Sequence, residues 1–200
     1  MIVIGITGGI GCGKSFVGDY MSEKYNALIL KADDIAHDVY EPGAVCYEKL
    51  IQVLGEECLN NDGTFDRKKI SAKIFSDPEA LAEVNSVVHP AVRKVIEDAI
   101  AEEAAGGGEI VLVEAALLIE SGYRDFCDEY WYVYADKDVR IQRLTSSRGM
   151  TGDAIEAVMR KQLDEEKFRS ECDYTVDNSG NFEKTAREIE ERIAYLKSRH

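Results

Sequence analysis

The sequence predicts an α/β fold in which a parallel sheet carries helices on both faces. Short apolar runs rich in β-branched residues alternate with longer amphipathic patterns, which is typical of strands joined by helical crossovers. A glycine-rich segment joins the first apolar run to the first helical pattern. The composition fits one globular domain, because 45% of the 200 residues are hydrophobic and 31% are charged.

The strands are predicted from short apolar runs. The first run, from Ile2 to Thr7, is continuous, which is typical of a strand buried on both faces. The second run ends near Asp33, and three more follow in the second half of the chain. The five predicted strands cover residues 2–7, 27–30, 110–113, 130–134 and 174–176.

The helices are predicted from apolar periodicity and from capping and breaking residues. Lys14 opens the first helical pattern, directly after the glycines. Between residues 34 and 85 only short helical patterns occur, and they predict a helical subdomain between the second and third strands. Three further helices are predicted before the third strand: one capped by Asp66 and running to Phe75, one started by Pro78, and one started by Pro90 and ended by Gly106 to Gly108. Two follow the fourth strand, the first begun by Asp136 or Asp138 and the second over residues 151–162. An amphipathic helix closes the chain, with Ile189, Ile193 and Leu196 on its apolar side.

The charge balance argues against some classes of partner. Lys and Arg number 24 while Asp and Glu number 38, so the formal net charge is −14. A protein that binds nucleic acids or anionic membranes needs a basic face. We therefore expect neither of these partners. The apolar runs are too short to cross a bilayer, and the start of the chain lacks the basic region of a signal peptide. Five cysteines, an odd number without a CxxC pair, fit a reducing cytoplasm.

A phosphate-binding motif occupies residues 8–15, whose sequence GGIGCGKS satisfies G-x-x-x-x-G-K-[ST]. The glycines let backbone N–H groups turn toward phosphate oxygens, and the following helix points its positive end at the same anions. The Lys14 ammonium can reach the β- and γ-phosphates, and the Ser15 hydroxyl can ligate Mg²⁺. The alternative is a glycine-rich turn with an incidental lysine. The motif predicts ATP or GTP binding, and no N-K-x-D run for guanine occurs.

Charged residues at three further places bear on the site, and the first two places each allow two interpretations. Asp33 or Asp34 follows the second strand, at the sheet edge where ligands bind, so either could accept a proton from an attacking hydroxyl or merely cap the next helix. Glu114 ends the third strand, where a carboxylate either holds Mg²⁺ or is a surface residue. Arg140 and Arg143, taken alone, indicate a solvated helix face.

Cys12 and His89 also allow two interpretations each. Cys12 lies just before a helix N-terminus, which favours a reactive thiolate, and the alternative is a buried, inert thiol. His89 either packs in the structure beside Pro90 or contacts substrate near the helical subdomain. Their positions in the sequence leave both interpretations open.

Over nearly its whole length the sequence resembles the dephospho-CoA kinase family, which phosphorylates the ribose 3′-hydroxyl of dephospho-CoA in the last step of coenzyme A synthesis. The phosphate-binding motif resembles the family's TGGIGSGKS, and residues 32–36 resemble part of its DAD-x-I-A. The further matching segments are residues 39–43 (V-x-x-P-G), Gly55 with 62–67 (FG…DG-x-L-x-R), 74–75 (V-F), 89–90 (H-P), 114–120 (P-L-L-x-E), 142–148 with Gln162 (R-L…R…Q) and 172–180 (A-D-x-x-I-D-N-x-G).

Four positions depart from the family's pattern. Cys12 replaces a serine, and Phe16 stands where threonine is common. Lys31 replaces the first aspartate of DAD, and Ala116 replaces the proline before Leu-Leu. None of these changes removes a residue to which the resemblance assigns catalysis, but Lys31 is the one most able to alter substrate or metal handling.

The resemblance implies a P-loop NTPase fold of the nucleoside-monophosphate-kinase type, with five parallel strands in the order 2-3-1-4-5. It implies a helical CoA-binding subdomain of residues 33–88 and a lid of residues 138–170. The remaining residues, 1–32, 89–137 and 171–200, form the core. ATP, Mg²⁺ and dephospho-CoA are the implied ligands, and we expect a cytoplasmic protein that is a monomer or a weak homo-oligomer.

The resemblance also implies a role for each site residue. Lys14, Asp33 and Arg143 are catalytic, with Asp33 as the base for the 3′-hydroxyl. The residues implied to bind ATP are Gly9, Gly11, Cys12, Gly13, Lys14, Ser15 and Phe16. Those implied to bind the substrate are Thr7, Asp33, His89 and Leu117, and those implied to bind Mg²⁺ are Ser15 and Glu114.

Two other functions remain as alternatives. One is a kinase for another small acceptor, such as a nucleoside or nucleotide, and the segments after the second strand and at His89-Pro90 argue against it. The other is a non-enzymatic switch that depends on ATP or GTP. The missing N-K-x-D run and the presence of Asp33 and Arg143 argue against the switch.

Overall fold

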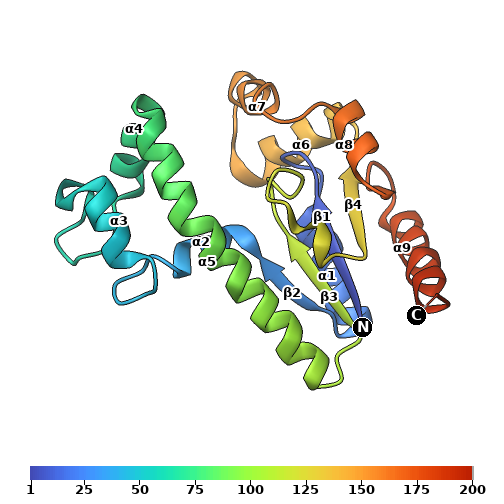
Figure 1. Cartoon of the computed structure of the whole chain (residues 1–200). Helices are drawn as coiled ribbons and strands as arrows, with labels where there is room; N and C mark the ends of the chain where they lie inside the picture. Colours follow the sequence, from blue (N-terminus) through green and yellow to red (C-terminus); the bar gives the residue numbers. More distant parts are fainter. Residues whose placement is uncertain (200) are drawn as a thin grey trace. The chain divides into compact units, whose positions relative to one another are not determined.

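The computed structural model describes residues 1–199, so His200, the last residue of the predicted core range, lies outside the described residues. The chain divides into two compact units, one formed by Met1–Leu30 with the segment from Ile100 onward, the other by Lys31–Ala99. The first unit holds the sheet (Figure 1). The strands are β1 (Ile2–Thr7), β2 (Leu28–Lys31), β3 (Ile110–Glu114), β4 (Glu129–Tyr134) and β5 (Tyr174–Asp177). The helices of this unit are α1 (Lys14–Tyr25), the short η2 (Tyr123–Asp125), α6 (Lys137–Arg148), α7 (Gly152–Met159), α8 (Glu165–Glu171) and α9 (Phe182–Lys197).

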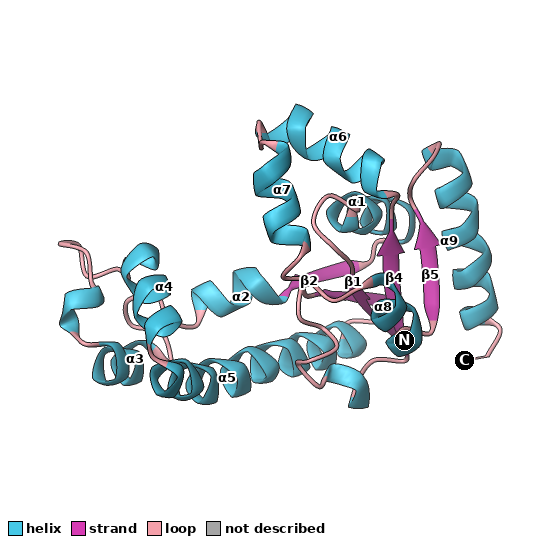
Figure 2. Ribbon diagram, turned by 90° about the horizontal axis from the view of Figure 1, so that it is seen from above, coloured by secondary structure: helices cyan, strands magenta, loops and turns pink. Residues whose placement is uncertain are grey.

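The strands form one parallel sheet in the order β2-β3-β1-β4-β5, which confirms the order that the resemblance implied. Figure 2 shows β5 beside helix α9. The central strand β1 pairs with β3 so that Ile6 lies beside Glu114, and with β4 so that Thr7 lies beside Tyr132. Because parallel strands end at the same edge of a sheet, the glycine-rich loop after β1 and Glu114 at the end of β3 lie at one edge.

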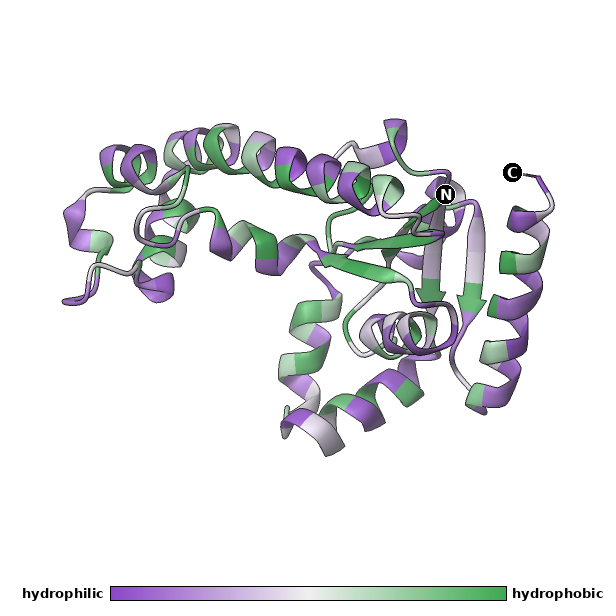
Figure 3. Cartoon of the chain, turned by 90° about the horizontal axis from the view of Figure 1, so that it is seen from below, coloured by the Kyte–Doolittle hydropathy of each residue, from purple (hydrophilic) through white to green (hydrophobic). Residues whose placement is uncertain are grey.

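Helices α1 and α9 cover one face of the sheet. Ile4 and Trp131 are fully buried there together with Val17 of α1 and Ile189 of α9. Figure 3 shows the hydrophobic residues of α9 on the side that faces the sheet and its hydrophilic residues on the outer side. Each buried side chain of this size contributes about 1.5–3 kcal/mol, so this packing fixes α1 and the loop that precedes it.

The segment between β3 and β4 and helix α8 lie on the other face. A Cβ atom on Gly5 would lie 2.8 Å from Leu118 Cδ2, so glycine is needed where this segment approaches the strand. Phe168 of α8 stacks on Tyr132 with the ring centroids 4.7 Å apart. The sequence did not predict α8, because Phe168 is the one buried residue among its seven and no apolar period is visible.

The second unit is helical, as predicted for this stretch of the chain. The predicted cap is confirmed, because the Asp66 carboxylate accepts hydrogen bonds from the backbone N–H groups of Lys68 and Lys69 at 2.9 and 3.2 Å. The elements of this unit are α2 (Ala32–Asp38), α3 (Tyr47–Leu54), the short η1 (Glu56–Cys58), α4 (Arg67–Ser76) and most of α5 (Pro78–Ala105).

Helix α5 shows that the prediction of a helix start at Pro90 is wrong. The helix runs from Pro78 to Ala105, as far as the predicted glycine stop, and holds Pro90 in its interior. An interior proline removes one backbone hydrogen bond and costs about 3 kcal/mol. The apolar stripe continues across this position, with Val88 and Val92 both buried, and this burial offsets the cost. No helix within residues 1–199, α5 included, is long and apolar enough to span a membrane.

Candidate active site

The glycine-rich loop between β1 and α1 owes its shape to its glycines. Gly11 has a φ of +79° and Gly13 a φ of +94°, and glycine adopts such angles without strain. Space is also restricted, because a Cβ atom on Gly13 would lie 2.3 Å from Asn178 Nδ2, and one on Gly9 would lie 2.4 Å from Arg140 Nη2. The positive φ angles therefore require glycine at positions 11 and 13, and the packing leaves little room for a Cβ atom at positions 9 and 13.

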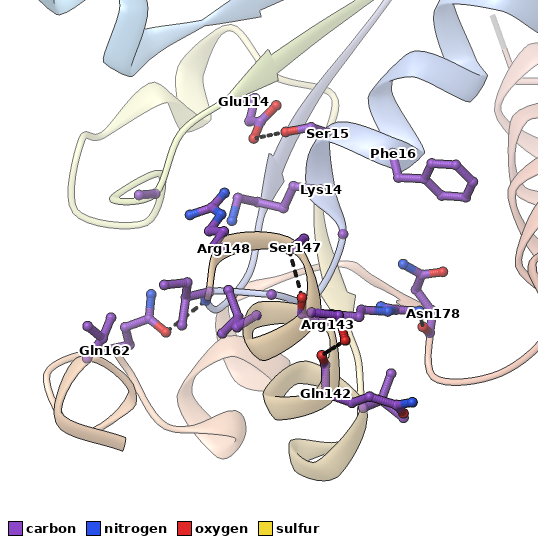
Figure 4. Close-up of a pocket in the computed structure, with 18 residues that line it drawn as sticks. Lys14, Ser15, Phe16, Glu114, Gln142, Arg143, Ser147, Arg148, Gln162 and Asn178 are labelled. Atoms are coloured by element: carbon purple, nitrogen blue, oxygen red, sulfur yellow. Dashed lines mark hydrogen bonds between the residues drawn. The ribbon is translucent and has the colours of Figure 1, made fainter. Parts of the chain in front are cut away.

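The loop borders a cavity of about 930 Å³ in the first unit, a volume typical of small-molecule sites. Lys14, Arg143 and Arg148 line this cavity (Figure 4). Helix α1 begins at Lys14, so the positive end of its dipole lies at the same place. Lys14 Nζ donates a hydrogen bond to the carbonyl oxygen of Gly8 at 2.8 Å, which holds the ammonium across the loop. Three cations and a helix N-terminus suit a polyphosphate.

Two backbone carbonyl groups fix Arg143 at the loop. Its guanidinium donates to the carbonyl oxygen of Cys12 at 3.3 Å and to that of Asn178 at 2.8 Å. The side-chain amide of Asn178 also donates to the Cys12 carbonyl, at 2.8 Å. These contacts contradict the interpretation of Arg143 as part of a solvated helix face. A guanidinium held at a phosphate-binding loop can stabilise charge on a transferred phosphoryl group.

Ser15 and Glu114 lie side by side at the edge of the sheet (Figure 4). Ser15 Oγ donates a hydrogen bond to Glu114 Oε1 at 3.4 Å. The other carboxylate oxygen, Oε2, is buried and has no hydrogen-bond partner within residues 1–199. A buried, unpaired carboxylate oxygen beside a hydroxyl fits a divalent cation. The described residues contain no group of three or more His, Cys, Asp or Glu that could hold a metal, so a cation here needs water or phosphate oxygens as well.

Cys12 is a buried thiol whose surroundings disfavour the thiolate. Its side chain is 1% exposed and belongs to the apolar core beneath the loop. Burial raises the pKa of the Cys12 thiol, and the opposing effects of Lys14 and Arg140 are smaller. Burial and the raised pKa therefore support the buried, inert thiol and argue against the reactive thiolate.

We expect Cys12 to resist alkylation in the folded protein. At neutral pH, iodoacetamide should modify it at least about tenfold more slowly than a free cysteine peptide, because burial blocks access and the raised pKa lowers the thiolate fraction. Peptide mass spectrometry at timed points measures the rate. The same reaction in guanidinium chloride is the control, in which all five cysteines should react. Rapid native labelling that ATP suppresses would contradict the buried thiol.

Thr7, Phe16 and Leu117 are the other predicted site residues of the first unit. Thr7 is fully buried at the end of β1, and its hydroxyl oxygen has no hydrogen-bond partner among the described residues. Phe16 is 55% exposed, lines the cavity and meets the ring of Phe182 edge-on at a centroid distance of 4.4 Å. Leu117 is exposed in the turn that follows β3.

Asp33 and His89 belong to the second unit. Lys31 occupies the N-cap position of α2, and no side chain makes a capping hydrogen bond there, so the interpretation of Asp33 or Asp34 as the cap is wrong. Asp33 is exposed in the first turn of the helix, where a negative charge interacts favourably with the helix dipole. His89 is exposed on α5, which contradicts its interpretation as a packed residue.

Three residues contact the loop in ways that were not predicted from the sequence. Asn178 and Arg140 touch it as described above, and Gln162 Oε1 accepts a hydrogen bond from the Ile10 N–H group at 2.9 Å. Gln162 and Asn178 fall in segments that resemble the family. Those segments carried no information about contacts, since 152 and 166 residues separate the bonded partners along the chain.

The parallel sheet order, the phosphate-binding loop after the central strand and the cations at its cavity define a P-loop kinase. The family model for dephospho-CoA kinase matches residues 2–184. The dephospho-CoA kinase of Corynebacterium diphtheriae is 37% identical over 198 residues, which cover 97% of this chain and 98% of the relative. That of Geobacter sulfurreducens is 34% identical over 191 residues, 96% of each chain. The chain belongs to the dephospho-CoA kinase family, and it is therefore an enzyme of the transferase class with ATP as a substrate.

Solved structures share the fold over the full chain. The crystal structure of TT1252 from Thermus thermophilus superposes with a TM-score of 0.82 at 30% identity and covers 98% of this chain and 97% of that one. The dephospho-CoA kinase from Campylobacter jejuni has a TM-score of 0.72 at 22% identity, with 99% and 98% covered. Shikimate kinase from Bacteroides thetaiotaomicron, at a TM-score of 0.57 and 14% identity, shares the fold alone, with 96% and 98% covered.

Proposed function

We propose that this chain transfers the γ-phosphoryl group of ATP to the ribose 3′-hydroxyl of dephospho-CoA, which yields coenzyme A and ADP. The observation that carries the proposal is the Arg143 guanidinium, held by two carbonyl groups at a phosphate-binding loop that also presents Lys14. Membership of the dephospho-CoA kinase family supports this choice of acceptor.

Within the first unit, the loop and its cations bind and orient the triphosphate. The backbone N–H groups of the loop and the start of α1 attract the β- and γ-phosphates. Lys14 and Arg143 both line the cavity and neutralise the negative charge that moves from the γ-phosphoryl group to the leaving oxygen. Neither side chain has to cross the cavity to do so, because each is already bonded to the loop backbone.

Ser15 and Glu114 are the residues that would hold Mg²⁺. The unpaired Glu114 Oε2 atom and the neighbouring Ser15 hydroxyl support this assignment. When bound, the cation would neutralise charge on the phosphates. Without it, Glu114 holds a negative charge beside the phosphate site and repels the nucleotide.

Asp33 is proposed as the base that accepts the proton of the 3′-hydroxyl. Support comes from its exposed carboxylate, which is not engaged as a helix cap, and from its place in the segment that resembles the family. Helical residues 33–88 are proposed to bind the rest of the acceptor. Thr7, His89 and Leu117 are proposed as further substrate contacts, and the exposure of the last two supports this role.

Residues 138–170 are proposed as a lid over the phosphates. Closure of such a segment excludes water, which would otherwise compete with the acceptor and hydrolyse ATP. We place the reaction in the cytoplasm, because all five cysteines are free thiols. We expect a monomer or weak homo-oligomer without a nucleic-acid partner, given the formal net charge of −14.

One experiment tests the proposal directly. The protein is incubated with ATP, Mg²⁺ and dephospho-CoA, and coenzyme A is sought as a product heavier by one phosphoryl group. Parallel reactions contain a nucleoside, a nucleotide or no acceptor. We expect product with dephospho-CoA and little ATP turnover without it. Preferential phosphorylation of a nucleoside, or ATP turnover that no acceptor changes, would contradict the proposal.

We expect Glu114→Gln to raise the Mg²⁺ concentration needed for half-maximal rate by about 10–100-fold, a size typical when a metal site loses a supporting group. The amide keeps the size of the side chain but removes the negative charge. Initial rates over a Mg²⁺ series at fixed ATP measure the shift. Glu109→Gln is the matched control, because Glu109 lies just before the start of the same strand and its ion pair with Lys197 is on the surface. An unchanged Mg²⁺ dependence of Glu114→Gln would rule out the ligand role.

A further inference from the structure

Two side chains from outside the phosphate-binding loop hold it at Ile10. Gln162 Oε1 accepts a hydrogen bond from the Ile10 N–H group at 2.9 Å, and Arg140 Nε donates one to the Ile10 carbonyl oxygen at 2.8 Å. Arg140 Nη2 also donates to Gln162 Oε1 at 3.3 Å. The three bonds form a closed network, here called the Ile10 clamp, in which side chains satisfy both backbone groups of one loop residue.

The clamp acts where the loop is otherwise most free. Glycines flank Ile10 on both sides, and Gly11 has the left-handed φ of +79°. Glycine loses more backbone freedom on ordering than any other residue, so an unsupported loop binds phosphate at an entropic cost. With the N–H and the carbonyl of Ile10 both engaged, the peptide planes on either side of this residue are fixed. The later N–H groups of the loop are then already oriented for phosphate oxygens.

The clamp residues also mark the two ends of the α6–α7 hairpin. Arg140 lies in the first turn of α6, and Gln162 follows the end of α7 by three residues. Figure 1 shows the two helices beyond the end of the sheet at which the loop lies. Helix α8, which follows Gln162, is held on the sheet by the stack of Phe168 on Tyr132. The segment between Arg140 and Gln162 is therefore tied to the loop at both ends.

We propose that Arg140 and Gln162 are positioning residues that shape the phosphate-binding loop and anchor both ends of the movable part of the lid, which then spans residues 141–161. This inference rests on the proposed roles of the loop in binding ATP and of residues 138–170 as a lid. The clamp gives the loop and the lid a shared support, so that closure of the hairpin does not disturb the oriented N–H groups.

Gln162→Met and Gln162→Glu separate the clamp from general stability. Methionine keeps the length of the side chain but has no oxygen, whereas glutamate keeps an oxygen acceptor and adds a charge that favours Arg140. Gln52→Ala, at an exposed position of α3, is the matched control. The probe is inorganic tripolyphosphate, titrated by calorimetry without any acceptor. We expect roughly tenfold weaker binding by Gln162→Met, from the loss of two hydrogen bonds, and binding within about threefold of the unsubstituted protein by Gln162→Glu.

Hydrogen exchange of the Ile10 amide, followed by NMR, reports on the clamp, and unchanged exchange of the core amides of β1 excludes a general loss of stability. The amide should exchange faster in Gln162→Met and stay protected in Gln162→Glu. Unchanged tripolyphosphate binding by Gln162→Met, or binding by Gln162→Glu as weak as that of Gln162→Met, would overturn the inference. If the unsubstituted protein binds tripolyphosphate but forms no coenzyme A, the proposed acceptor is wrong while the clamp stands.

Discussion

Lys14→Ala should turn over about 10²–10³-fold more slowly than the unsubstituted enzyme, the usual cost of removing one preorganised charge from a transition state. Lys14 lies at the start of α1 and is held across the loop by its bond to Gly8. Its ammonium can follow the γ-phosphoryl group through the transfer. ATP affinity should fall less than turnover, because the loop N–H groups and the helix dipole remain. Single-turnover measurements with saturating ATP separate the two effects.

Lys24→Ala is the matched control for this substitution. Lys24 lies on the same helix and makes a surface ion pair with Glu190, which contributes little to stability. Its turnover and melting temperature should stay close to those of the unsubstituted protein. If Lys14→Ala retained near-normal turnover, the assignment of residues 8–15 as the catalytic phosphate loop would be lost.

Asp33→Asn should lose about 10²–10⁴-fold in turnover, the range expected when a general base is removed. Asparagine has the size of aspartate and forms hydrogen bonds, but it does not take up the proton of the 3′-hydroxyl. ATP affinity should barely change, because Asp33 is not part of the phosphate loop. Stability should fall by no more than the interaction of one exposed charge with the helix dipole, about 0.3–1 kcal/mol.

The neighbouring Asp34→Asn is the control for charge and position. Asp34 is also exposed in the first turn of α2, so its substitution changes the helix dipole interaction in the same way. Turnover, ATP affinity and melting temperature are measured on both variants. Equal and small effects on turnover would remove Asp33 as the base, and a large effect confined to Asp34 would move the role to its neighbour.

Local patterns predicted most of the fold. The apolar run Ile2–Thr7 became a strand buried on both faces, and Asp66 became the cap of α4. The pattern around Pro90 led to a wrong helix start, because proline is a strong local signal for the beginning of a helix. The buried apolar stripe on both sides of Pro90, which keeps the helix continuous, depends on tertiary packing. Helix α8 carries no apolar period, since its position depends on the contact of Phe168 with a distant strand.

The site was predictable where the chemistry lies in one segment. The phosphate-binding motif identified Lys14 and Ser15 and predicted that they lie between a strand and a helix. The resemblance to the family identified Arg143. The contacts that hold Arg143 could not be predicted, since its partners Cys12 and Asn178 are 131 and 35 residues away along the chain. The raised pKa of the Cys12 thiol could not be predicted from the sequence either, because it depends on burial of the side chain by the sheet and helices.

Because its native cysteine side chains are buried or only partly exposed, the protein is suited to selective dye labelling at introduced cysteines. Cys172 alone is partly exposed among the five, and burial raises its pKa to about 12, which leaves little thiolate for a maleimide at neutral pH. Cysteines introduced at Asp153 of α7 and at Arg187 of α9, both exposed, should therefore take up donor and acceptor fluorophores selectively. Energy transfer between them would follow the hairpin in single molecules while ATP enters and ADP leaves.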